Sequence, residues 1–150
     1  MAIPSKAQVN FYGTELQVIN DLSGIADGDF TSTVTTFTNT DNVPSASFLF
    51  EIGLNAAASP GGYIALYAKP INMGSGNRDQ IAPSAFFKST FIGSIVVPGA
   101  AAGLLTMSFD TFLPSYNDAQ EYEFYVENKT GQSLTAVNCW ISPKALGPKA

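Results

Sequence analysis

The stretch from Glu121 to Ser142 carries more groups of chemical interest than any other part of the sequence. Its glutamates are Glu121, Glu123 and Glu127. Hydrolysis of a glycosidic bond needs two carboxyl groups that converge in a cleft, with one of them buried so that its pKa rises. Here the glutamates alternate with an apolar row instead. That row is Tyr122, Phe124 and Val126. This alternation is the period of a strand, so we predict that the glutamates and Tyr125 form a solvated face rather than a catalytic pair.

The same stretch contains a glycosylation sequon and the only cysteine of the chain. The sequon is Asn128, Lys129 and Thr130. Asparagine, threonine and the glycine that follows are typical turn residues, so we predict a tight turn here and not a glycan attachment site. Cys139 lies next to the only tryptophan, Trp140. With no partnering base, Cys139 is predicted to be a small buried apolar residue and not a nucleophile.

Acidic residues outside this stretch are the remaining candidates for metal binding. Asp27 and Asp29 flank a glycine and Asp21 lies nearby, but the twelve-residue calcium loop is not present, so we predict an acidic turn. Asp79 stands beside Arg78 in a polar segment without the pattern of a phosphate loop. The absence of histidine excludes Ser-His-Asp and Cys-His systems and histidine-based zinc sites. We predict no metal, no cofactor and no enzymatic activity.

Composition narrows the class of protein. The chain has 150 residues, 45% of them apolar and only 13% charged, which suits one β-rich domain that rests against other protein surfaces. The net charge is −5, and six lysines and one arginine form no basic stripe, so we expect no nucleic-acid partner. No apolar run reaches the roughly 18 residues of a membrane span. The N-terminus lacks a secretory signal, which leads us to expect synthesis in a reducing cytoplasm.

The elements that position these residues are all predicted to be strands. Runs of β-branched and aromatic residues alternate with clusters of Gly, Pro, Asn, Asp and Ser, and no stretch has a helical period. The predicted strands are 8–12, 15–19, 30–38, 45–55, 62–69, 91–97, 104–109, 121–128 and 133–141. In the fourth of them, Ala46, Phe48, Phe50, Ile52 and Leu54 share one face, which predicts a half-buried strand. The long polar segment from Ile71 to Phe87 is predicted to be a functional loop.

These elements predict an all-β fold. About eight main strands at short spacing, with no crossover helix, indicate an antiparallel β-sandwich of jelly-roll type in a single domain over residues 1–150. An immunoglobulin-type sandwich is the nearest alternative, but the cysteine pair that usually surrounds its tryptophan is absent. Residues 1–7 and 142–150 are expected to be extended, flexible arms.

Aromatic residues give a softer indication of function. The chain has eleven phenylalanines, six tyrosines and one tryptophan, most of which should fill the core. Tyr63, Tyr67 and Tyr125 fall on the faces predicted to point away from the core. There they could line a platform for sugars or contact another subunit, because tyrosine is enriched at interfaces.

Three segments resemble small jelly-roll virion proteins of tailed bacteriophages, the capsid decoration or cement proteins. The first is the Gly-Gly-Tyr-Ile-x-Leu-Tyr strand at Gly61 to Tyr67, which a variable polar loop follows. The second is the Ile-Gly-Ser-Ile-Val-Val strand at Ile92 to Val97, and the third is the Asn-x-Thr-Gly-Gln turn at Asn128 to Gln132. The resemblance covers roughly the last 60% of the chain. The proline-rich turn that often precedes the late strand is reduced here to Leu113-Pro114.

The resemblance implies a structural protein that decorates and stabilises a phage capsid from outside. It implies the major capsid protein as the partner, the surface of the virion as the location and a homo-oligomer, with a trimer favoured. We expect the partner interface to include Ile3, Pro4, Lys6, Tyr63, Tyr67, Arg78, Phe86, Tyr125, Lys144 and Leu146. The alternative is a carbohydrate-binding β-sandwich of a phage tail or baseplate, which the tyrosines and the polar loops would serve.

Overall fold

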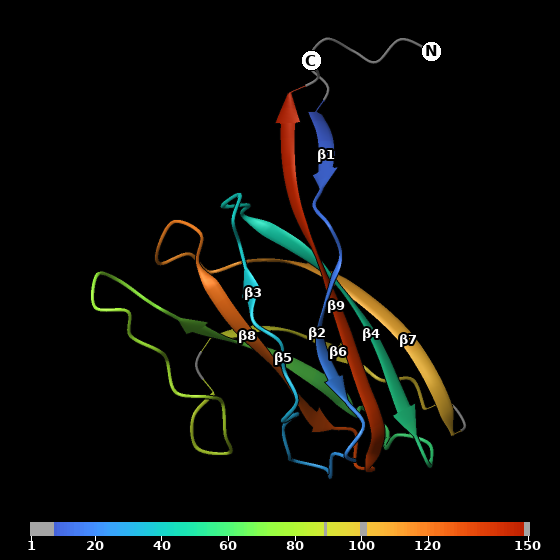
Figure 1. Ribbon diagram of the computed structural model, residues 1–150. Helices are drawn as coiled ribbons and strands as arrows, with labels where there is room; N and C mark the ends of the chain where they lie inside the picture. Colours follow the sequence, from blue (N-terminus) through green and yellow to red (C-terminus); the bar gives the residue numbers. More distant parts are fainter. Residues whose placement is uncertain (1–7, 89, 100–101, 149–150) are drawn as a thin grey trace, which may run out of the picture.

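The computed structural model describes residues 8–88, 90–99 and 102–148. This part of the chain is all-β, with nine strands and no helix, and the strands form a sandwich of two antiparallel sheets (Figure 1). The strands are β1 Gln8–Tyr12, β2 Leu16–Asp21, β3 Phe37–Thr38, β4 Ser45–Leu54, β5 Tyr63–Ile71, β6 Phe91–Val96, β7 Gly103–Phe112, β8 Glu121–Lys129 and β9 Leu134–Pro148. The predicted fold class is therefore confirmed. The described residues contain no helix that could span a membrane.

Each sheet has one long open edge on the same side of the molecule. In the first sheet β9 lies between β4 and the pair β1 and β2, and β4 continues to β7 at the edge. The second sheet has the order β3-β8-β5-β6, with β6 at its edge. These two edge strands are in contact across the sandwich, and the hydroxyl of Thr111 near the end of β7 donates to the carbonyl of Ile92 in β6 at 3.1 Å.

The core lies between the sheets and is rich in phenylalanine. Its members on β4 are Ala46, Phe48, Phe50, Ile52 and Leu54, all of them buried as their alternation predicts. The opposing row on β8 is Tyr122, Phe124 and Val126, also buried. The rings of Phe48 and Phe124 meet edge to face across the sandwich, with centroids 5.1 Å apart.

The segment predicted as a strand over 30–38 forms only the two-residue strand β3. Its backbone passes from one sheet to the other and back. Thr31 donates to Val126 of β8, Thr35 donates to Val18 of β2, and Phe37 returns to pair with Tyr122. A segment that changes partners every few residues cannot form a continuous ladder. The threonines and other β-branched residues therefore predicted the extended backbone correctly, but not the continuous strand.

The C-terminal tail also differs from the prediction. Residues 142–148, expected as part of a flexible arm, continue β9 as a regular strand. Through Lys144 this strand pairs with β4, and from Lys144 to Pro148 it pairs with β1. Figure 1 shows that β1 and the end of β9 form a two-stranded ribbon that extends beyond the other strands. Residues 1–7 and 149–150, the rest of the predicted arms, lie outside the described residues.

Candidate functional site

The glutamates of β8 do not form a uniformly solvated face, so the prediction is wrong for one of them. Glu127 is buried, with 1% of its surface exposed. It points away from the core, but two segments cover it. The backbone of Phe30 pairs with Glu127, and the ring of Phe30 packs on that of Tyr67 with centroids 5.7 Å apart. From the other side Lys88 reaches over the same position. Period-2 alternation predicts which way a side chain points but not which loop lies over it.

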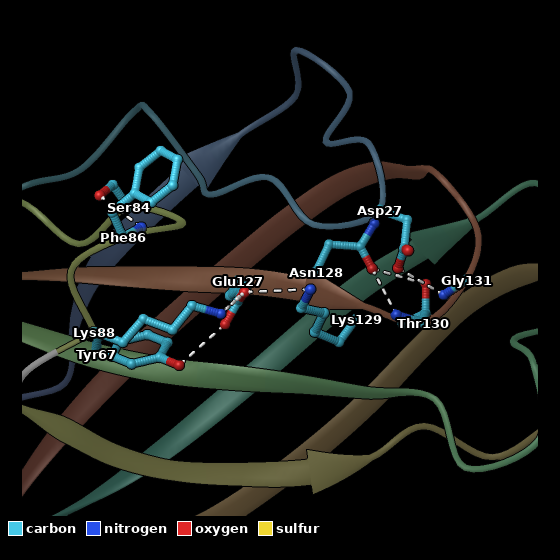
Figure 2. Close-up of polar contacts among 10 residues, drawn as sticks. All are labelled: Asp27, Tyr67, Ser84, Phe86, Lys88, Glu127, Asn128, Lys129, Thr130 and Gly131. Carbon is cyan, nitrogen blue, oxygen red and sulfur yellow. Dashed lines mark hydrogen bonds and ion pairs between the residues drawn. The ribbon is translucent and has the colours of Figure 1, made fainter.

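Three groups satisfy the buried carboxylate of Glu127 (Figure 2). Lys88 Nζ lies 2.5 Å from Oε1, Lys129 Nζ lies 3.7 Å from the same oxygen, and the hydroxyl of Tyr67 donates to Oε2 at 3.0 Å. Burial, together with the hydrogen bond and the charge of Glu127, raises the pKa of Tyr67 to about 12. Both oxygens of this carboxylate are therefore engaged, by two lysines and by the hydroxyl of Tyr67. Glu127 thus connects the second sheet to the loop that carries Lys88 and has a structural role. It lacks the second converging carboxylate that hydrolysis needs.

A variant tests this structural role. Glu127→Gln keeps the size of the side chain but removes the charge, so Tyr67 and Lys88 lose a charged acceptor. We expect the free energy of unfolding to fall by about 1–3 kcal/mol. Urea titration would measure the change. Glu51→Gln, on the outward face of β4, should change stability little; an equal loss in both variants would contradict the role of Glu127.

The sequon forms a buried turn, as predicted. Asn128 and Thr130 are both fully buried. The amide nitrogen of Asn128 donates to the carbonyl of Ile25 at 2.9 Å and to that of Gln132 at 2.7 Å. Its oxygen accepts from the backbone and hydroxyl of Thr130 (Figure 2). Gly131 takes a φ of +76° and donates to Asp27 at 2.8 Å. The amide that a glycan would modify is therefore enclosed in the folded protein.

Asp21 has a structural role that the sequence did not reveal. Its carboxylate is fully buried and accepts hydrogen bonds from two serines and a threonine. Ser23 donates through its backbone at 3.0 Å and its hydroxyl at 2.5 Å, Ser32 through its backbone at 2.6 Å and its hydroxyl at 3.1 Å, and Thr33 through its backbone at 3.3 Å. Burial alone would raise the pKa, but these bonds outweigh it and lower the pKa of Asp21 to about 2. Asp21 thus fastens β2 to the segment that crosses between the sheets.

Asp21 and Asp27 are both engaged in hydrogen bonds within the protein. Asp21 is saturated by its donors, and Asp27 is engaged by the backbone of Gly131. Across residues 8–88, 90–99 and 102–148, no group of three or more acidic, cysteine or histidine residues is arranged to hold a metal ion. Cys139 is fully buried in the core, where burial raises the pKa of its thiol well above the ordinary value. The prediction that Cys139 is a buried apolar residue is confirmed.

The residues expected at a partner interface are scattered, and the expectation that Tyr67 is available there is wrong. Tyr67 is 5% exposed, because Phe30, Phe91 and Glu127 cover it. Tyr125, opposite Tyr67 in the register, is half-buried and donates to Glu123 at 2.9 Å. The others that the structure places are Tyr63 and Phe86, which are 38% and 101% exposed, Arg78, which is exposed, and Lys144, which pairs with Asp110.

The terminal members of that set are not placed. Ile3, Pro4 and Lys6 lie outside the described residues, and only the backbone of Leu146 is described, within β9. The described members also belong to different parts of the surface. Tyr63 and Phe86 lie on the second sheet and its long loop, whereas Lys144 lies on the first sheet. A single interface that includes all of them stays a prediction.

An aromatic cleft at the open β6–β7 side is a candidate site that sequence reasoning missed. The cleft has a volume of about 450 Å³ and lies between the start of β6 and the segment after β7. Phe91, Phe112 and Tyr116 border it and are 56%, 80% and 52% exposed. Thr90 and Thr111 also line it. The volume falls within the usual range of about 300–1,000 Å³ for small-ligand sites.

The sequence did contain a signal for one wall of this cleft. The predicted strand ended at Phe109, but β7 continues to Phe112. Along β7 the outward row is Leu104, Thr106, Ser108, Asp110 and Phe112, all of them exposed, and the inward row includes Phe109. Extending the alternation by three residues would have placed Phe112 on the solvent face. A large aromatic ring there invites a functional explanation, since most exposed positions of this row are polar.

Comparisons with known proteins find structural likeness only. No protein-family model matches the chain, and no curated protein matches it. One similar solved structure is the carbohydrate-binding module CBM6cm-2 from Cellvibrio mixtus lichenase 5A in complex with cellotriose, with a TM-score of 0.40 and 13% identity over 91% of this chain and 97% of that chain. Another is the C-terminal CBM6 of LamC, a marine laminarinase from Zobellia galactanivorans, with a TM-score of 0.40 and 16% identity over 89% and 98%. Such distant likeness indicates neither a shared ligand nor a shared site.

Proposed function

We propose that this protein is a non-catalytic binding domain that takes carbohydrate in the aromatic cleft. The carrying observation is the exposure of Phe91, Phe112 and Tyr116 around one concave site. A sugar ring presents an apolar face of C–H groups and a rim of hydroxyls. Exposed aromatic rings bind the C–H face by apolar contact, and neighbouring polar groups bind the hydroxyls. Thr90 and Thr111 also line the cleft, and their hydroxyls are held by hydrogen bonds to Gln80 and to the carbonyl of Ile92. The proposal rests on this cleft, and the two carbohydrate-binding modules are too distant to carry it.

The non-catalytic part of the proposal rests on the placement of the acidic residues. Glu127 and Asp21 are buried and fully engaged, and neither lines the cleft. The acidic residue nearest to it in sequence is Asp110, which no second lining carboxylate faces. Acid–base hydrolysis needs two carboxyl groups across the scissile bond. Incubation with the bound glycan should therefore leave the glycan intact by mass spectrometry.

Removing one aromatic wall tests the cleft. We expect Phe112→Ala to lower glycan affinity about tenfold or more, because covering a phenylalanine side chain contributes about 1.5–3 kcal/mol. A glycan array would first identify a ligand, and calorimetry would then measure the affinity. Phe86→Ala is the matched control, since Phe86 is a fully exposed phenylalanine on the long loop, outside the cleft. Equal affinities of the native protein and Phe112→Ala would contradict the proposal.

A role in a phage virion is the second candidate, and the projecting ribbon of β1 and β9 favours it. Beyond Lys144, β9 pairs with β1 alone among the described strands. A two-stranded ribbon is marginally stable by itself in water, and an extended edge readily accepts a partner strand. A neighbouring major capsid protein would supply that strand on the outside of the head.

The virion role has its own test. We expect the purified protein to sediment with mature heads of the phage that encodes it, and a variant that lacks residues 1–12 to remain in solution. Light scattering on a sizing column would show whether the free protein is the trimer expected at local three-fold positions. Failure of the full chain to bind heads would reject the virion role and leave carbohydrate binding untouched.

A further inference from the structure

A second hollow adjoins the aromatic cleft on the outward face of the first sheet. It has a volume of about 280 Å³ and is lined by Ser45, Asp110, Thr111, Phe112 and Lys144. Thr111 and Phe112 also line the aromatic cleft, so the two sites meet at these two residues. Phe112 is 80% exposed. A ligand longer than one site could therefore extend past Phe112 from one site into the other.

The two sites differ in chemistry. The aromatic cleft has no charged side chain among its lining residues. The hollow contains one charge of each sign, because Lys144 Nζ lies 2.7 Å from Asp110 Oδ2. Ser47 donates to the other oxygen, Oδ1, at 2.5 Å. An ionised carboxylate has about four acceptor positions. Asp110, whose side chain is 57% exposed, therefore keeps about two acceptor positions open to solvent and to a ligand.

We propose that the ligand is an uncharged oligosaccharide that crosses Phe112, with one sugar in the aromatic cleft and the next held through its hydroxyls by Asp110. This inference rests on the proposed function and adds the length and the charge of the glycan. Hydroxyl groups of a neutral sugar donate to a carboxylate without the cost of burying a further charge. An acidic glycan would meet Asp110 and a chain of net charge −5, which disfavours it.

Length defines the first part of the test. The probes are neutral and acidic glycans on an array, each present as a graded series from one sugar upward, followed by calorimetry with the best series. We expect neutral oligosaccharides to bind at least tenfold more tightly than their single sugar, because only they reach both sites. Binding that does not change with length, or that needs an acidic glycan, would overturn the inference but leave the proposed function in place.

Variants of the hollow define the second part. Asp110→Asn should lower the affinity for the oligosaccharide about tenfold, since hydrogen bonds to charged groups contribute about 1.5–3 kcal/mol, and should leave the affinity for the single sugar unchanged. Glu15→Gln, an exposed carboxylate on the far side of the first sheet, is the matched control. An Asp110→Asn variant that binds the oligosaccharide normally would also overturn the inference. Absence of binding to every glycan would reject both the inference and the proposed function, and would direct attention to a protein partner.

Discussion

Asp21→Ala is expected to lower the free energy of unfolding by about 3–5 kcal/mol. Three backbone N–H groups and two hydroxyls converge on this buried carboxylate, from Ser23, Ser32 and Thr33. Alanine would remove the shared acceptor of these donors, and a hydrogen bond to a charged group contributes about 1.5–3 kcal/mol. The lost bonds also join β2 to the segment that crosses between the sheets. Urea or thermal unfolding would measure the loss.

The control for this prediction is an aspartate of the same charge on the surface. Asp118 is exposed, so Asp118→Ala should leave stability nearly unchanged. Asp21→Asn should be almost as unstable as Asp21→Ala. The asparagine NH₂ group is a donor and would face the N–H and O–H donors that now bind one of the carboxylate oxygens. Full stability in Asp21→Asn would show that the shape of the side chain matters and its charge does not.

The dependence on pH follows from the same carboxylate. The pKa of Asp21 is about 2 in the folded protein and 3.8 ordinarily. Because folding lowers this pKa, the contribution is fully present above about pH 4 and is lost as the pH falls through 2. A shift of this size corresponds to about 2 kcal/mol. The gap in stability between native protein and Asp21→Ala should therefore shrink in acid. A gap that stays constant from pH 6 to pH 2 would contradict this account.

Phe48→Ala is expected to cost a similar amount, about 3–5 kcal/mol. Phe48 is fully buried at the centre of an aromatic cluster. Its ring centroid lies 5.1 Å from that of Phe124, 5.9 Å from that of Phe109 and 6.5 Å from that of Phe50. These neighbours come from β8, β7 and β4, so a cavity here would weaken contacts between the sheets as well as within one. Thermal unfolding should show a midpoint lower by about 10 °C.

Two variants bracket this result. Phe48→Leu fills much of the space and should lose clearly less stability than alanine. Phe86→Ala removes a ring that is fully exposed and should have little effect. If Phe86→Ala were as destabilising as Phe48→Ala, burial would not explain the importance of Phe48, and the assignment of the core would be wrong.

The sequence predicted burial correctly for strands in which one row of alternating side chains is apolar. The β4 row from Ala46 to Leu54 and the β8 row of Tyr122, Phe124 and Val126 were identified by alternation alone, and both are buried. The turn at Asn128 was identified by residue type, and the structure confirms it. In each case the deciding interactions lie within the segment or within one strand, so local sequence carries the information.

Prediction failed where the environment comes from segments distant in the chain. Glu127 points outward as its position requires, yet Phe30 and Lys88, about 97 and 39 residues away, cover it. The segment over 30–38 has strand composition but changes partner between the sheets. The ends of strands were also set too early, at Phe109 and at Ile141. Pairing with a neighbour, and not intrinsic preference, determines how far a strand runs.

The sequence by itself determined an all-β chain, its main buried rows, its tight turn and the lack of a histidine-based active site. Those properties depend on residue type and on a period of two, which are local. Only the tertiary structure decided that Asp21 and Glu127 are buried and hydrogen-bonded and that Phe91, Phe112 and Tyr116 line one cleft. These residues come together because β6 and β7 end the two sheets on the same side. No local sequence pattern encodes this arrangement of the two edge strands, since it depends on how two whole sheets pack.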